Sequence, residues 1–153
     1  MKYTGIFGVE FNNAIFGFVE KENLTDIEKK EMIQSAHAAV LHWQKFSKST
    51  IANSQRGYYM LAKAYVKARE KENALKYANL CFEITTKNED KLLDWDLAYA
   101  YEMKARTAAM NNDKETFKKF YKMAKEQEVI IKDPEDLKYF SLDFKDGDWF
   151  RFA

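Results

Sequence analysis

The chain has 153 residues, 46% of them hydrophobic and 16% aromatic, which is enough apolar material for one folded domain and argues against a disordered chain. Its 25 basic and 24 acidic residues leave a formal net charge of +1, so no global electrostatic field favours nucleic acid or a membrane as a partner. The single cysteine excludes an internal disulfide, and no cluster of residues has the spacing of a structural zinc site, so we expect neither a metal nor a cofactor.

The N-terminal stretch predicts a helix and carries no targeting signal. No apolar run approaches the roughly 20 residues needed to span a bilayer, and no small-residue cleavage site follows the first residues, so we expect a cytoplasmic protein. After a loose lead-in over residues 1–5, apolar residues recur at helical spacing within residues 7–20. This stripe consists of Phe7, Phe11, Ile15 and Phe18.

A capping box marks the start of the second helix. Thr25 is followed three residues later by Glu28, and this pattern predicts a helix that continues to about Ser47. His37 and His42 lie five residues apart on it, which turns them about 140° around the axis, so they cannot hold one metal ion together. We expect each histidine to be packed or hydrogen-bonded. The apolar stripe of this helix consists of Met32, Ala36, Val40 and Trp43.

Residues 56–82 contain two short amphipathic helices with a tight polar break between them. Ser49 or Asn53 is expected to cap the first of these helices. The break at Glu70–Asn73 is too short for anything but an antiparallel hairpin. Cys81 lies on the apolar face, where we expect a buried and inert thiol. The two apolar faces consist of Tyr58, Leu61, Ala62 and Tyr65 on the first helix, and of Ala74, Ala78 and Cys81 on the second.

Two further helices are predicted after the central hairpin. Asn88–Asp90 indicates the start of a helix that continues to about Met110. Asn112 is expected to cap the next helix, with Glu115 three residues further on. The two buried faces consist of Leu93, Leu97, Tyr101, Ala105 and Ala108, and of Phe117, Phe120, Tyr121 and Ala124. Lysines without interleaved aromatic residues give the second helix a solvated outer face, and these are Lys114, Lys118, Lys119, Lys122 and Lys125.

The C-terminal residues predict a last helix and an aromatic tail. Asp133 at the N-cap and Pro134 at the first helical position indicate a helix over about residues 134–145. The tail, residues 146–153, carries Trp149, Phe150 and Phe152. Aromatic residues at a chain end usually dock on a surface, so the tail either folds back on its own chain or contacts a second copy in a homo-oligomer.

One spacing pattern occurs twice in the chain and points to a repeat. Steps of nine, four and three residues connect Tyr65, Ala74, Ala78 and Cys81, and the same steps connect Ala108, Phe117, Tyr121 and Ala124. Residues 56–82 resemble a tetratricopeptide repeat, although the two copies are further apart than the roughly 34 residues usual in that family. The resemblance implies an all-α fold, a right-handed superhelical array of antiparallel helix hairpins with a C-terminal capping helix. The hairpins would cover residues 7–47, 50–86 and 90–128, with the cap at 134–145; a plain antiparallel bundle is the alternative.

Several short segments are similar to a group of small bacterial tetratricopeptide-repeat proteins that have no assigned activity. These segments are FNN at residues 11–13, AHAAVLHW at 36–43, DWDLAYAYE at 94–102 and DPED at 133–136. The likeness covers most of the chain. It implies a fold and a broad interaction role, and no catalytic activity comes with it.

The repeat resemblance also implies a groove for a protein or peptide partner, made by the first helix of each hairpin. The residues expected to face it are Arg56, Tyr59, Lys63, Lys67, Tyr99, Glu102 and Arg106. Basic and aromatic side chains together suit an extended or acidic peptide. Alternatively, Arg56, Glu102 and Arg106 bridge adjacent helices. Tyr59 and Lys63 replace the lysine and asparagine of repeats that clamp a C-terminal carboxylate, so we do not expect that specificity.

Catalytic motifs are missing from the sequence, which leaves an enzymatic role without direct support. The chain has no phosphate-binding loop, dinucleotide fingerprint, zinc-protease motif or nucleophile elbow. The alternative function is a small-molecule or catalytic pocket between the second helix and the central hairpin. It would use His37 or His42 with Asp96 or Glu102, and it requires a perturbed histidine in a closed cavity.

Overall fold

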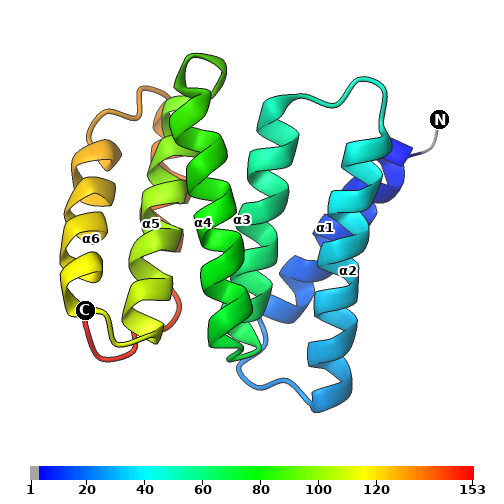
Figure 1. Ribbon diagram of the computed structural model, residues 1–153, viewed down its shortest axis with the longest axis horizontal. Helices are drawn as coiled ribbons and strands as arrows, with labels where there is room; N and C mark the ends of the chain where they lie inside the picture. Colours follow the sequence, from blue (N-terminus) through cyan, green and yellow to red (C-terminus); the bar gives the residue numbers. More distant parts are fainter. Residues whose placement is uncertain (1–3) are drawn as a thin grey trace.

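The computed structural model describes the backbone of residues 4–153 and the side chains from Asn12 onward, and the regular elements of this part are all helices (Figure 1). They are α1 (Thr4–Val19), α2 (Asp26–Lys45), α3 (Ile51–Lys67), α4 (Lys71–Lys87), the short 3₁₀ turn η1 (Glu89–Lys91), α5 (Asp94–Met110), α6 (Lys114–Glu128) and α7 (Pro134–Lys145). The all-α prediction is therefore confirmed. None of the described helices is both long and apolar enough to cross a bilayer.

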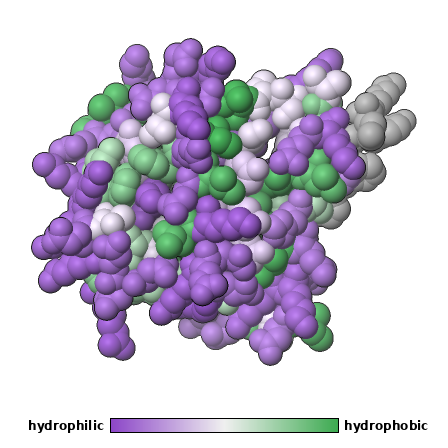
Figure 2. Space-filling model, in the orientation of Figure 1, coloured by the Kyte–Doolittle hydropathy of each residue, from purple (hydrophilic) through white to green (hydrophobic). Residues whose placement is uncertain are grey.

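Consecutive helices pack side by side along the molecule. The pairs α1/α2, α3/α4 and α5/α6 each form a contact along their length, and α2/α3 and α4/α5 connect one pair with the next. The odd-numbered helices also touch directly, α1 against α3 and α3 against α5. Helix α7 packs on α5 and α6 at the end of the row. Hydrophilic residues cover most of the face in Figure 2.

Two clusters of buried side chains hold the helices together. The first lies among α1–α5 and includes Ile15, Met32 and Leu61, each at most 1% exposed. The second is rich in aromatic residues and alanines, joins α5, α6, α7 and the tail, and includes Phe140 and Trp149. Because α5 contributes residues to both clusters, it is the central helix of the fold. Helices α2 and α3 pack closely at Gly57, because a Cβ atom on this residue would lie 3.1 Å from Val40 Cγ2.

The two strongest helix-start predictions are confirmed. Thr25 and Glu28 form the reciprocal capping box at the start of α2. The Asp133 side chain accepts hydrogen bonds from the backbone N–H groups of Glu135 and Asp136, at 2.9 and 3.1 Å, and Pro134 occupies the first turn. Cys81 is fully buried as expected, and burial raises the pKa of its thiol far above the ordinary value.

Two other cap predictions are wrong. Helix α3 is capped by Thr50, where Ser49 or Asn53 was the expectation, and Asn53 instead closes the box by accepting from the Thr50 backbone N–H. Helix α6 is capped by Asp113, which accepts from the Thr116 N–H at 3.1 Å, and not by the preceding asparagine. The observed caps directly follow expected ones, since Thr50 follows Ser49 and Asp113 follows Asn112. Neighbouring polar residues have similar capping preference, so the sequence does not separate them.

The start of α5 and the break before α4 also differ from the prediction. Residues 89–91 form only a 3₁₀ turn, and α5 begins at Asp94, where the Asp96 carboxylate accepts from the Leu93 backbone N–H. Leu93 is consequently outside the helix and 54% exposed, although it was expected on the buried line. Helix α4 begins at Lys71, so the break is shorter than predicted and contains Arg69 with φ +64°.

The N-terminal prediction is tested only in part. Helix α1 begins at Thr4, inside the stretch expected to be a lead-in, and residues 1–3 lie outside the described part. Of the predicted apolar stripe, Ile15 is fully buried and Phe18 packs against the first cluster. The side chains of Phe7 and Phe11 lie outside the described residues.

Candidate functional site

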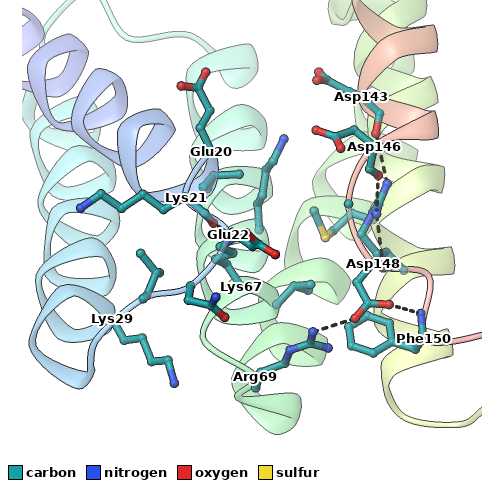
Figure 3. Close-up of a pocket in the computed structure, with 18 of the residues that line it drawn as sticks. Glu20, Lys21, Glu22, Lys29, Lys67, Arg69, Asp143, Asp146, Asp148 and Phe150 are labelled. Atoms are coloured by element: carbon teal, nitrogen blue, oxygen red, sulfur yellow. Dashed lines mark hydrogen bonds and ion pairs between the residues drawn. The ribbon is translucent and has the colours of Figure 1, made fainter.

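A cavity of about 580 Å³ lies where α3 and α5 face the α1–α2 connection and the C-terminal tail (Figure 3). Its volume is within the range of ligand pockets, about 300–1,000 Å³. Val66 and Met103, 9% and 0% exposed, are apolar side chains of its lining from α3 and α5. The rest of its lining is mostly charged, so charged and apolar side chains share the surface of the cavity.

Two walls of the cavity each carry charges of a single sign. Helix α3 and the turn after it contribute cations alone, which are Lys63, Lys67 and Arg69. The C-terminal side contributes aspartates alone, which are Asp143, Asp146 and Asp148. The α1–α2 connection carries both signs, with Glu20, Lys21 and Glu22, and α2 adds Lys29. Helix α5 also contributes one charge of each sign, Glu102 and Arg106. Figure 3 shows the α1–α2 connection and the aspartates on opposite sides of the cavity.

The two lysines on α3 make one ring contact and one backbone hydrogen bond. The Lys63 ammonium lies 5.8 Å from the centroid of the Tyr59 ring, which is near the limit of a cation–π contact. Lys67 donates to the backbone carbonyl of Lys21, whose own ammonium pairs with Glu28. Both α3 lysines are partly exposed to solvent. Because neither is paired with a carboxylate in the described structure, they are the cations of the cavity with capacity for an acidic ligand.

Beside the cavity, Tyr59, Glu102 and Arg106 form a buried network between α3 and α5. The Tyr59 hydroxyl donates to Glu102 Oε2 at 3.1 Å, and Arg106 Nε donates to Glu102 Oε1. The side chains of Glu102 and Arg106 are only 3% and 7% exposed. Burial, with the Glu102 charge adding to it, raises the pKa of Tyr59 well above its ordinary value, so its hydroxyl stays a donor. The three groups satisfy one another inside the fold.

Arg106 also fixes the course of the C-terminal tail. Its Nη1 donates to the backbone carbonyls of Asp146 and Asp148 at 3.0 and 3.3 Å, and its Nη2 donates to that of Asp143 at 3.2 Å. Its guanidinium lies 4.1 Å from the centroid of the Trp149 ring. Four of its donor positions are therefore used by the protein itself, which leaves little capacity for a ligand.

The tail follows the first of its two expected courses, folding back on its own chain. Trp149 is 7% exposed, and its indole N–H donates to the Phe144 carbonyl at 3.1 Å. Phe152 contacts Phe117 on α6. Gly147 has φ +77°, and a Cβ atom there would lie 2.7 Å from Arg106 Nη1, so this position requires glycine.

A second arginine, Arg56, bridges α3 and the start of α5. Its Nε and Nη2 atoms donate to the two oxygens of Asp96 at 2.8 and 3.0 Å. Its guanidinium also stacks 4.2 Å from the centroid of Trp95. Asp96 is fully buried, and its backbone carbonyl accepts from the Gln55 side chain at 3.0 Å. This bidentate pair is a connection between helices.

The seven residues expected in the groove thus divide into two sets. Lys63, Lys67, Glu102 and Arg106 line the cavity, whereas Arg56, Tyr59 and Tyr99 do not. Of the two roles left open for the arginines and Glu102, the structure has them bridging helices. Tyr99 also has a partner within the fold, because its hydroxyl donates to Asp143 Oδ2. Arg56→Ala and Tyr59→Ala are therefore expected to destabilise the fold, which differs from the neutral effect that a groove position would have.

Of the residues of the alternative pocket, Glu102 lines this cavity, whereas His37, His42 and Asp96 do not. His37 Nε2 lies 2.8 Å from the Tyr65 hydroxyl, and the ring also packs edge-on against Tyr77. Burial, with Lys76 adding to it, lowers the pKa of His37. Among the side chains described, no group of three or more histidine, cysteine or acidic residues could hold a metal ion.

The sequence reasoning did not find the two outer walls of the cavity. The α1–α2 connection, residues 20–24, is a short polar segment without a motif. A signal was present in the DGD segment at residues 146–148, because a glycine between two aspartates indicates a turn.

Comparisons with known proteins add no assignment to this site. No family model matches the chain, and neither curated proteins nor solved structures give a match.

Proposed function

We propose that the chain is a non-catalytic interaction module of the cytoplasm that binds a peptide segment of a protein partner in the cavity between α3, α5, the α1–α2 connection and the tail. The observation that carries the proposal is that two walls of this cavity carry opposite charges, with Lys63 and Lys67 on one wall and aspartates on the other. A peptide that presents an acidic side chain to the lysines and a basic side chain to the aspartates complements both walls.

The helix order supports a repeat-like arrangement for this module. We propose a right-handed, tetratricopeptide-repeat-like array of three hairpins with α7 as the cap. In such an array the first helix of each hairpin lines the concave side, and the direct contacts of α1 with α3 and of α3 with α5 agree with this geometry. The cavity is lined by α3 and α5, which in this proposal are the first helices of the second and third hairpins and belong to the concave side where such arrays bind their partners.

The test is a panel of fluorescently labelled eight-residue peptides that vary in the number and position of acidic and basic residues. Binding is measured by fluorescence anisotropy with the wild type and with the double variant Lys63→Gln/Lys67→Gln. We expect mixed-charge peptides to bind the wild type and to lose about tenfold in affinity with the variant, because each exposed ion pair contributes up to about 0.7 kcal/mol.

The matched control is Lys114→Gln/Lys118→Gln on the outer face of α6. It removes the same two charges at the same helical spacing, and both residues are exposed and outside the cavity. Equal losses in the two double variants would show a nonspecific charge effect and contradict the proposed site. Absence of binding to any peptide of the panel would contradict the function.

A further inference from the structure

The tail is held at the cavity by two sets of contacts that differ in burial. The inner set is buried and consists of Arg106 with the backbone carbonyls described above and of Trp149 in the second cluster. The outer set, called the outer latch here, consists of Arg69, Asp148 and Phe150. Its ion pair joins Arg69 Nη2 and Asp148 Oδ2 at 2.7 Å, with the two side chains 57% and 46% exposed.

The outer latch is part of the cavity lining, where the turn after α3 meets the tail. The Arg69 guanidinium lies 4.8 Å from the centroid of the Phe150 ring, and the Phe150 backbone N–H donates to Asp148 Oδ1 at 2.6 Å. All three residues line the cavity. Figure 3 shows Arg69 reaching across to Asp148 from the turn after α3, so a single ion pair connects that turn to the tail.

Two features favour opening of the outer latch and oppose the packing of Phe150 against both buried clusters. Exposed ion pairs contribute little to stability because water and salt screen them. The closed tail also contains two non-glycine residues in the left-handed region, Phe150 at φ +53° and Arg151 at φ +68°. This conformation costs free energy for residues with a side chain, and opening of the outermost tail releases it. The buried inner set can stay in place meanwhile.

We propose that the outer latch is a gate on the cavity, and that an acidic group of the bound segment opens it by replacing Asp148 on Arg69. The inference rests on the proposed peptide-binding function and deepens it, because it assigns to the ligand a carboxylate that binds Arg69. Arg69 follows Lys63 and Lys67 along the chain, so the exchange extends the row of cations offered to an acidic segment. In the free protein, Asp148 satisfies Arg69 and keeps the outer latch closed.

The test uses the full chain in four forms: wild type, Asp148→Asn, Arg69→Gln and Asp146→Asn. Asparagine at 148 can still accept the Phe150 N–H and loses only the charge, so Asp148→Asn isolates the ion pair. Asp146→Asn is the matched control, since it removes an equal charge from the same cavity wall outside the outer latch. Two measurements are made: amide hydrogen exchange of residues 150–152, and binding of fluorescein-labelled tetraglutamate, with tetraglutamine as the uncharged reference.

We expect Asp148→Asn and Arg69→Gln to speed exchange at residues 150–152 by about two- to fivefold, the range that corresponds to an exposed ion pair. Their effects on binding are opposite. Asp148→Asn is expected to bind tetraglutamate several-fold more tightly than the wild type, because Arg69 is free, and Arg69→Gln is expected to bind it more weakly. Asp146→Asn leaves the exchange unchanged and raises affinity by less than Asp148→Asn.

Three results would overturn the gate. These are unchanged exchange in both latch variants, a shift of binding in the same direction in both, and equal gains in Asp148→Asn and Asp146→Asn. Absence of tetraglutamate binding in all four proteins also overturns the proposed exchange of carboxylates. The cavity's binding function is tested separately by the mixed-charge panel, so binding there with a failed gate would refute only the inference about Arg69.

Discussion

Replacing Arg106 by methionine is the perturbation for which the structure gives the clearest magnitude. The substitution leaves the Glu102 carboxylate buried with the Tyr59 hydroxyl as its remaining described donor. Breaking a buried ion pair from one side costs about 3–5 kcal/mol, because the charge that stays behind is neither solvated nor compensated. The retained hydrogen bond from Tyr59 places the expected loss at the lower end, about 3 kcal/mol.

This loss is a large part of the stability of an ordinary domain, about 5–15 kcal/mol. For a chain of this size it corresponds to a fall in melting temperature of about 10 °C, at roughly 2–4 °C for each kcal/mol. Urea unfolding followed by circular dichroism at 222 nm measures it directly, with the free energy of unfolding extrapolated to water.

A double-mutant cycle separates the buried charge from lost packing. Glu102→Gln removes the charge, so Arg106→Met should cost about 2 kcal/mol less in that background than in the wild type. If Arg106→Met alone loses less than about 1 kcal/mol, or if the two substitutions are additive, the network is not the buried, interdependent unit described here.

Two further predictions concern the α2–α3 surface and the start of α7. His37 is expected to titrate below pH 6.5 in an NMR titration, because burial and Lys76 disfavour its protonated form. The unfolded chain then takes up this proton first, so the contribution of His37 to stability is lost as the pH falls from 6.5 through the lowered pKa; a midpoint at or above 6.5 would contradict this. Asp133→Ala is expected to lower the free energy of unfolding by about 1 kcal/mol, whereas Asp133→Asn, which can still cap, should lose much less. Equal losses in the two variants, measured by urea unfolding, would show that the cap hydrogen bonds are not the cause.

The local features of the fold could be predicted from the sequence because they depend on residues a few positions apart. Apolar residues at helical spacing predicted seven helices, and the caps at Thr25 and Asp133 were located from short patterns. Where several polar residues adjoin, as around Thr50 and Asp113, the same reasoning erred by a residue or more, since local preference differs little among neighbours. The predicted helix start at residues 88–90 is wrong because α5 begins at Asp94. Its first turn is fixed there by Asp96, which is held by Arg56 from another helix.

The site depended on contacts between residues distant in the chain, and only the tertiary structure decided them. Arg56 and Arg106 are of a type expected to bind an acidic ligand, yet Arg56 is satisfied by Asp96, 40 residues away. Arg106 is satisfied by carbonyls of the C-terminal segment as well as by Glu102 on its own helix. No spacing rule within one helix contains that information, because side-chain partners across helices depend on how the helices pack. The sequence alone determined that the chain is helical and where most helices begin. Packing decided which charged residues stabilise the fold and which, such as Lys63 and Lys67, remain on a cavity wall.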